Sequence, residues 1–565
     1  MCPTSVVTEP APGRRFLRWV GGGALTIALV GLTAGYITLL RAPAAGTFHD
    51  DGIYLVTAKA LAEDRGYRII SIPSEPPQTK YPILLPWVLS LVWRIYPSFP
   101  DNLVSLRLVP LIAMLTWLCL SRLLLCRMGA SRSEATVITL LTAASPWIAF
   151  LSTTLMAETL FAAFLAGGLL MITRVHHGDG TRADAFLAGA LVGAAVLTRM
   201  AGVAPALAGV LTFVPRRRWA AAAQYSAGTA LVTLPWFWWV MRQEAAAAPV
   251  DTYYSAVNYA SWNIVASYAW SEKLAVLGVN AIEGGLALPS VWGFQTSSTM
   301  LVLPVAAGVL VLVSRGLWRA RAEPSAMLVA AYCAIHAMWV WPPLRFAVPV
   351  VPLVLWFLFV GMGRSRRIGC VVALSLFASG GFQFWSVAAQ AREKGVVSPV
   401  SNAENWNETT RALNLISRQT PSDATLAGNL DPMYYLFTGR KGVRAYTVDP
   451  YLLFYDMRHR SDNPLGTADR LRNRLVVTKA DYVIITPQSH SEEIRHLRQL
   501  VDELAQTCPG SLSLVAGSVD SGYAIYKTDR LVLTRPESCA RDKYAAEGDF
   551  WSSEGRVDVA GRQLP

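Results

Sequence analysis

Charged residues are scarce in this chain. They make up 16% of its 565 residues, whereas apolar residues make up 53% and the mean hydropathy is +0.35. A soluble globular protein carries roughly 25% charged residues. The composition therefore excludes an ordinary soluble protein and predicts a membrane protein that crosses the bilayer several times.

The sequence also lacks the motifs of a zinc site and of a nucleic-acid-binding protein. No two cysteines have Cys-x-x-Cys spacing and no His/Cys cluster has zinc spacing, so a structural zinc site is not expected. No basic stretch is interleaved with base-stacking aromatic residues, so the net charge of +12 does not indicate a nucleic-acid partner. The basic residues lie instead in short loops between apolar runs, as is typical of loops on the cytoplasmic side of a membrane.

The apolar runs predict about eleven transmembrane helices. The first run, Trp19–Leu40, is long enough to span a bilayer and follows three arginines that favour a cytoplasmic N-terminal side. A shorter run, Tyr81–Tyr96, contains two prolines and is expected to lie half-embedded on the outer side. If this run crossed the membrane, the triple arginine at 216–218 would lie on the outer side, which is disfavoured because basic loops lie on the cytoplasmic side. The predicted spans are 19–40, 103–125, 135–151, 159–172, 183–197, 202–214, 219–240, 299–313, 327–341, 346–360 and 368–388.

This pattern divides the chain in two. Residues 1–389 form a mainly α-helical membrane domain with outer loops 41–101 and 242–298, and the first loop contains an amphipathic helix, Gly52–Glu63, predicted to lie on the membrane. Residues 390–565 are polar and contain no run long enough to span. Helix-like stretches there alternate with strand-like ones such as Ala480–Thr486, which predicts a small α/β domain on the outer side.

Cysteine placement agrees with this division. Cys508 and Cys539 are the only cysteines that the predicted topology places outside. An oxidising compartment permits them to form a disulfide bond. Two unpaired cysteines are the alternative.

Six charged residues are predicted to meet at the outer face. Polar residues in or beside membrane spans are candidates for function by default. The cations could hold an anionic lipid head group, and a carboxylate could accept a proton from an attacking hydroxyl. The carboxylates are Asp50, Asp51 and Glu158, and the cations are Lys80, Arg199 and Arg345.

Each of these residues has a simpler interpretation. Arg199 and Arg345 could be snorkelling arginines at span ends, and Asp50 could cap the following helix. Glu158 could be a cap or face water. His49 is expected to be a bystander, and aromatic residues of the second outer loop, such as Tyr253, Tyr254, Trp262 and Trp270, are expected to be interfacial belt residues rather than sugar platforms.

The motifs resemble those of the GT-C glycosyltransferase superfamily, and within it the family of protein O-mannosyltransferases and bacterial lipid A aminoarabinose transferases. The matching elements, in order, are Asp50-Asp51 with Tyr54, Lys80-Tyr81-Pro82 with Leu84, Ser145-Pro146 with Glu158, Leu197-Thr198-Arg199, and Arg345-Phe346 with Pro349 and Pro352. They cover roughly residues 15–390. The C-terminal domain matches only in its position.

The resemblance implies an inverting glycosyltransferase that uses a polyprenyl-phosphate-linked sugar as donor. Asp50 would be the general base, and Lys80, Arg199 and Arg345 would hold the lipid phosphate. A divalent metal is possible, but Thr79 stands where the aminoarabinose transferases have an acidic residue that helps to bind one, so metal dependence stays open.

The expected function is therefore sugar transfer to a lipid, glycan or protein hydroxyl at the periplasmic face of the inner membrane, with the C-terminal domain in the periplasm. The alternative is a transporter or flippase of an anionic lipid-linked sugar. A transporter often shows repeated halves with broken helices, and the sequence contains no such repeat.

Overall fold

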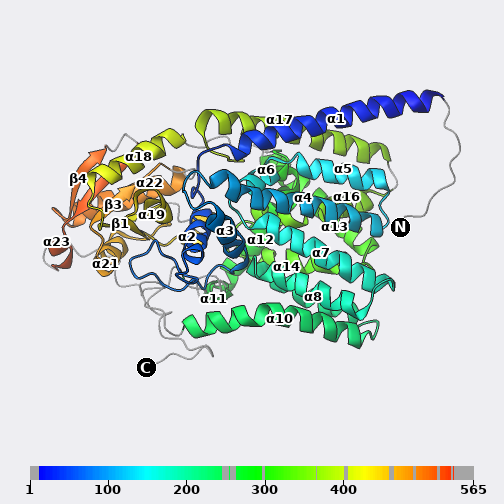
Figure 1. Cartoon of the computed structure of the whole chain (residues 1–565), viewed down its shortest axis with the longest axis horizontal. Helices are drawn as coiled ribbons and strands as arrows, with labels where there is room; N and C mark the ends of the chain where they lie inside the picture. Colours follow the sequence, from blue (N-terminus) through cyan, green and yellow to red (C-terminus); the bar gives the residue numbers. More distant parts are fainter. Residues whose placement is uncertain are drawn as a thin grey trace.

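The computed structural model describes residues 12–244, 254, 262–294, 299–363, 366–399, 405–456, 463–487, 491–517, 522–535 and 539. A long helical bundle occupies one end of the molecule, and a mixed α/β unit occupies the other (Figure 1). Helices α2 and α3 lie where the two parts meet.

The bundle and its outer loops contain most of the helices. Their bounds are α1 Pro12–Leu40, α2 Asp50–Ala62, α3 Leu84–Ile95, α4 Leu103–Arg127, α5 Arg132–Ala143, α6 Pro146–Thr153, α7 Glu158–His177, α8 Arg182–Val196, η1 Met200–Gly202, α9 Val203–Phe213, α10 Trp219–Glu244, α11 Trp262–Ser267, α12 Trp270–Val291, α13 Thr299–Arg319, α14 Pro324–Ala337, α15 Leu344–Ala347, η4 Val348–Val350, α16 Val351–Met362 and α17 Arg366–Lys394.

Among the residues described, six helices are long and apolar enough to cross a membrane, or seven segments if the bent pair α5–α6 counts as one. Five of the six coincide with predicted spans. The sixth, α12, lies in the stretch that the sequence predicts as an outer loop. A polytopic, mainly helical membrane protein is thus supported, whereas the count of eleven spans stays a prediction.

The span predicted at 135–151 is broken. Helices α5 and α6 meet at an angle of 66°. Ser145 accepts a hydrogen bond from the Ile148 amide, and Pro146 stands at the first position of α6. A serine cap followed by proline is a typical start of a new helix, because proline needs no hydrogen bond there.

Small residues let the bundle helices approach closely. A side chain added at Gly189 of α8 would lie 1.9 Å from the Tyr225 carbonyl oxygen of α10, and one at Gly228 would lie 2.1 Å from the Phe186 carbonyl oxygen. In a membrane, where lipid is as apolar as leucine, such close backbone packing is a main source of helix association.

The C-terminal part is a five-stranded sheet flanked by helices. The strand order is β2-β1-β3-β5-β4, with β2, β1 and β3 parallel and β5 antiparallel to both β3 and β4. The small α/β unit expected from the sequence is present. Its elements are α18 Trp406–Gln419, β1 Thr425–Gly428, α19 Asp431–Thr438, β2 Lys441–Arg444, α20 Pro450–Phe454, α21 Ala468–Thr478, β3 Tyr482–Ile485, α22 Ser491–Thr507, β4 Leu512–Gly517, β5 Ala524–Thr528 and α23 Arg530–Thr534.

Helix α2 does not lie on the membrane surface as an amphipathic helix. Most of its residues are buried, including both Ile53 and Thr57. It packs on α3 and on α19, and its apolar side chains share one hydrophobic core with strands of the C-terminal sheet, such as Ala427 and Val483. The sequence prediction was wrong because the C-terminal domain covers the face that was expected to meet lipid.

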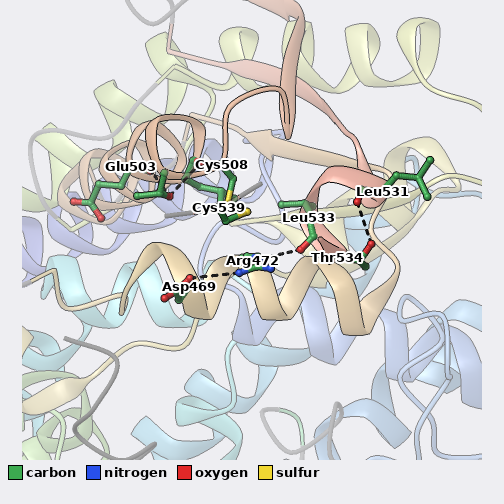
Figure 2. The surroundings of a disulfide bond; sticks show 10 residues. Asp469, Arg472, Glu503, Cys508, Leu531, Leu533, Thr534 and Cys539 are labelled. Carbon is green, nitrogen blue, oxygen red and sulfur yellow. Dashed lines mark hydrogen bonds and ion pairs between the residues drawn. A yellow bond between two sulfur atoms is a disulfide. The ribbon is translucent and has the colours of Figure 1, made fainter. Parts of the chain in front are cut away.

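The structure joins Cys508 and Cys539 in a disulfide bond, the pairing that the sequence singled out. Figure 2 shows the bond beside α21 and α23, where the Arg472 guanidinium donates a hydrogen bond of 2.8 Å to the Leu533 carbonyl oxygen. The bond links the segment just after α22 to the chain beyond α23.

Replacing both cysteines with serine is expected to destabilise this domain by about 3–4 kcal/mol, because the bond closes a loop of 31 residues in the unfolded chain. Thermal unfolding of the full chain in detergent, with and without a reducing agent, measures this. The reducing agent should lower the midpoint of the wild type and leave that of the double serine variant unchanged. Equal midpoints for both proteins under oxidising conditions would contradict the prediction.

Candidate active site

The acidic pair stands at the start of α2, and its two carboxylates have different surroundings. Asp51 is buried and accepts hydrogen bonds from the backbone amides of Gly46, at 2.7 Å, and Phe48, at 3.0 Å. Burial and the charge of Asp50 raise the pKa of Asp51, although these amides act in the opposite direction. Both Asp51 oxygens are thus engaged in closing the turn before α2.

Asp50 faces the charged cluster instead. Its carboxylate accepts a hydrogen bond of 2.5 Å from the Tyr81 hydroxyl and pairs with the Arg345 guanidinium at 2.9 Å. Burial alone would raise the pKa of Asp50, but Arg345, Tyr81 and more distant cations together lower it to about 2. Asp50 is the first residue of α2, whereas His49 occupies the cap position, and the His49 side chain accepts no capping hydrogen bond. The simple capping interpretation of Asp50 is therefore wrong.

Glu158 connects two arginines from distant parts of the chain. It begins α7 and is 1% exposed, so the alternative that it faces water is excluded. One of its oxygens pairs with both Arg199, which lies between α8 and η1, and Arg345, which lies in α15. The other oxygen is buried without a hydrogen-bond partner in the part of the chain that the structure describes.

Both arginines are held by ion pairs inside the protein. The Arg199 side chain is 9% exposed and its guanidinium stacks over the Phe346 ring at 5.1 Å. Arg345 bridges Asp50 and Glu158 and is one-quarter exposed. The arrangement Asp50–Arg345–Glu158–Arg199 is therefore one continuous ion-pair network, hereafter the charged network.

Lys80 lies beside this network. Burial lowers the pKa of Lys80 to about 8, while the charge of Asp50 acts to raise it. The Gln78 side chain accepts from the amides of Lys80 and Tyr81, which fixes the turn before α3. The same turn therefore supplies both the Lys80 cation and the Tyr81 hydroxyl that bonds to Asp50.

Arg107 is a buried charged residue near the site that the sequence motifs did not include. It lies within the apolar helix α4, is 1% exposed, and donates hydrogen bonds to the carbonyl oxygens of Leu40, Ala42 and Ala44. It thus holds the segment that connects the first helix to the acidic turn. An arginine near the middle of the outer half of an apolar run was a signal that could have identified it.

Two aromatic residues near the acidic turn also differ from expectation. His49, predicted to be a bystander, contacts Asp431 of the C-terminal domain. Tyr254, predicted to be an interfacial belt residue, is buried and donates a hydrogen bond to the same carboxylate. Tyr253 lies outside the described residues.

The carboxylates of the site are largely occupied by arginines and backbone amides. Among the residues that the structure describes, no three His, Cys, Asp or Glu side chains lie close enough to hold a metal ion. The described side chains thus provide no set of three such metal ligands.

The fold has counterparts among solved structures. ArnT from Cupriavidus metallidurans in the apo state is 14% identical with a TM-score of 0.52, and the match covers 91% of this chain and 99% of that chain. The structure of ArnT bound to undecaprenyl phosphate is 15% identical with a TM-score of 0.53, and covers 90% of this chain and 99% of that one. No protein-family model and no curated protein matches the sequence.

A weaker match is the archaeal oligosaccharyltransferase AglB from Archaeoglobus fulgidus, solved with an inhibitory peptide and a dolichol-phosphate. It is 12% identical with a TM-score of 0.47, and the match covers 81% of this chain and 69% of that chain. The two ArnT structures, whose TM-scores are above 0.5, are GT-C glycosyltransferases. The fold implied by the sequence motifs is thus confirmed, and the family within that fold stays a prediction.

Proposed function

We propose that this chain is a glycosyltransferase that moves a sugar from a polyprenyl-phosphate donor to an acceptor hydroxyl at the periplasmic face of the inner membrane. The observation that carries the proposal is the charged network with Lys80 beside it: the Asp50 carboxylate pairs with Arg345 and lies near Lys80, and Glu158 joins Arg199 to Arg345. Its occurrence in a fold similar to that of ArnT, one structure of which is bound to undecaprenyl phosphate, supports a lipid-phosphate ligand.

The proposed reaction is a single displacement. The acceptor oxygen attacks the anomeric carbon of the sugar while the bond from that carbon to the phosphate oxygen breaks. The hydroxyl proton passes to Asp50, and polyprenyl phosphate leaves with the bonding electron pair. Attack from the side opposite the leaving group inverts the anomeric configuration.

The cations have two roles in this scheme. Lys80 and Arg345 bind the donor phosphate and stabilise the charge that develops as it leaves. Arg199, held by Glu158 and Phe346, positions Arg345 through their shared carboxylate and adds positive charge to the site. Glu158 thus acts by holding the arginines, and Asp51 by shaping the turn that presents Asp50.

Asp50 and the donor phosphate would share the Arg345 guanidinium, and this explains how the strongly acidic Asp50 carboxylate can serve as a base. Without donor, Arg345 pairs with Asp50 and contributes to the low pKa of that group. A bound phosphate competes for the same guanidinium and weakens this pairing. The pKa of Asp50 then rises because its burial is less compensated, and a carboxylate with a higher pKa is a stronger base.

A direct assay tests the proposal. Purified protein is incubated with a panel of labelled polyprenyl-phosphate sugars and extracts containing lipid, glycan and protein acceptors. Release of polyprenyl phosphate together with label in an acceptor is the expected result, and the Asp50→Asn variant is the matched control. Label that crosses a vesicle membrane without bond cleavage would instead indicate a transporter.

Orientation is tested separately. A cysteine at the exposed position Ser422, in the C-terminal domain, is expected to react with an impermeant thiol reagent in intact spheroplasts. A cysteine at the exposed Ser133, in the first turn of α5 and in the segment predicted to be cytoplasmic, is expected to react only after the membrane is broken. The opposite pattern would place the charged network on the cytoplasmic side and overturn the assigned face.

A further inference from the structure

The acidic turn is fastened to the C-terminal domain by a buried polar contact. Asp431, the first residue of α19, is completely buried, and its two oxygens have different partners. One contacts the His49 Nε2 atom at 3.0 Å, and the other accepts a hydrogen bond of 2.7 Å from the Tyr254 hydroxyl. Three segments that are distant in the sequence thus meet at one carboxylate.

Charge and hydrogen bonding make this contact specific. Burial alone would raise the pKa of Asp431, but His49, Arg444 and Tyr254 together hold it below its usual range. The Tyr254 hydroxyl also accepts a hydrogen bond of 2.9 Å from the Arg444 amide, at the end of strand β2. An ionised carboxylate in a buried site is costly unless such partners surround it.

Close packing surrounds the polar contact. A side chain added at Gly52 of α2 would lie 3.0 Å from the Pro432 side chain, and one added at Gly46 would lie 2.4 Å from that of Met433. The first turn of α19 therefore lies directly against both ends of the acidic turn, which runs from Gly46 to Gly52.

The contact is made by the residue next to the proposed base. His49 has a φ of 61°, a left-handed conformation that is uncommon for a residue other than glycine. On one side of it the Asp51 carboxylate holds the backbone of Gly46 and Phe48. On the other side Asp50 projects to Arg345 and Tyr81.

We propose that Asp431 is a positioning residue: through His49 and Tyr254, the C-terminal domain holds the acidic turn in the geometry that directs Asp50 toward the charged network. This inference rests on the proposed function for its catalytic meaning. It makes the C-terminal domain part of the active-site framework rather than an appended module.

Full-chain Asp431→Ala tests the proposal kinetically. The expected result is a loss of turnover of about 10- to 100-fold, since a small displacement of a reacting group has an effect of this size. The apparent KM for the donor should change less than about threefold, because the phosphate-binding cations are untouched. His49→Ala should cause a similar loss, and the double variant should lose little more than either single one.

A matched control separates positioning from general damage. Asp449 belongs to the same domain, and its carboxylate accepts hydrogen bonds from the Tyr451 and Leu452 amides of its own helix. Asp449→Ala is expected to leave turnover near the wild-type value. Equal losses in both variants, or unchanged turnover in a folded Asp431→Ala protein, would overturn the proposal.

Hydrogen exchange provides a readout that does not require transferase activity. The amides of Gly46 and Phe48 are expected to exchange at least about tenfold faster in Asp431→Ala than in the wild type, because opening of the turn becomes easier. If the wild type transfers no sugar but these amides exchange faster in Asp431→Ala, the proposed function fails, and the role of Asp431 in holding the acidic turn stands. Unchanged exchange overturns that role. Should Asp431→Ala not fold, Tyr254→Phe is held to the same criteria; it removes the hydrogen bond to Asp431 and the one that the Tyr254 hydroxyl accepts from the Arg444 amide.

Discussion

Replacing Asp50 with asparagine is expected to lower turnover by about 100-fold or more, the usual range for loss of a general base. Asparagine has nearly the same shape as aspartate and can still accept the hydrogen bond from Tyr81. It cannot take up the proton of the acceptor hydroxyl. The change therefore removes the proposed chemistry while it preserves most of the geometry around the start of α2.

Donor binding should respond far less. Lys80 and Arg345 remain in place, and loss of the Asp50 charge frees Arg345 to interact with the phosphate. Steady-state turnover and direct binding of a labelled donor separate the two effects. Asp64→Asn, at an exposed carboxylate just after α2 that pairs with Arg94, serves as the control and should behave as wild type. Wild-type turnover in the Asp50→Asn protein would remove Asp50 from the mechanism.

The residues of the charged network could be predicted because topology restricts where they lie. Glu158, Arg199 and Arg345 stand near the ends of apolar runs, and alternation of the basic loops placed those ends on one side of the membrane. The structure brings all three together with Asp50. Topology could not predict how these side chains pair. One Glu158 oxygen forms ion pairs with both Arg199 and Arg345, so neither arginine is held open for a phosphate by the topology alone.

Contacts between distant segments were beyond the sequence analysis. His49 and Asp431 are 382 residues apart, and no local pattern links them. The same is true of α2, whose apolar residues suggest a lipid-facing helix until the C-terminal sheet is placed against them. Hydrophobicity predicts which side chains are shielded from water. It does not predict whether lipid or another part of the protein surrounds them.

The break between α5 and α6 and the apolar helix α12 show a different limit. Ser145-Pro146 carries a recognisable helix-start pattern, yet the surrounding hydrophobicity favoured one continuous span. For α12, the 22 residues Trp270–Val291 include Glu272, Lys273 and Glu283 and read as a mixed loop. Hydrophobicity averaged along a run thus conceals both interruptions and apolar helices that contain a few charged residues.

Arg345→Ala is expected to have the broadest effect of any substitution in the site. Arg345 pairs with Asp50 and Glu158 and is a proposed ligand of the donor phosphate. The variant should bind the donor more weakly, because a charge-assisted contact worth roughly 1.5–3 kcal/mol is lost. Its turnover should also fall, since the leaving phosphate loses a stabilising charge. Arg345→Lys should recover only part of this, because an ammonium cannot contact both carboxylates as the planar guanidinium does.

The pH dependence distinguishes the role of Arg345 from simple damage. In the wild type the pKa of Asp50 is about 2, so the carboxylate stays ionised as pH falls toward about 4. Without Arg345, burial dominates and the pKa of Asp50 rises, so that lowering the pH protonates the base. The profile of kcat/KM against pH should therefore gain an acid limb at higher pH than in the wild type. Arg68→Ala, at an exposed arginine of the same outer loop, should leave the profile unchanged. If Arg345→Ala lowered activity by the same factor at every pH, Arg345 would not control the ionisation of Asp50, and the idea that phosphate and base share this guanidinium would fail.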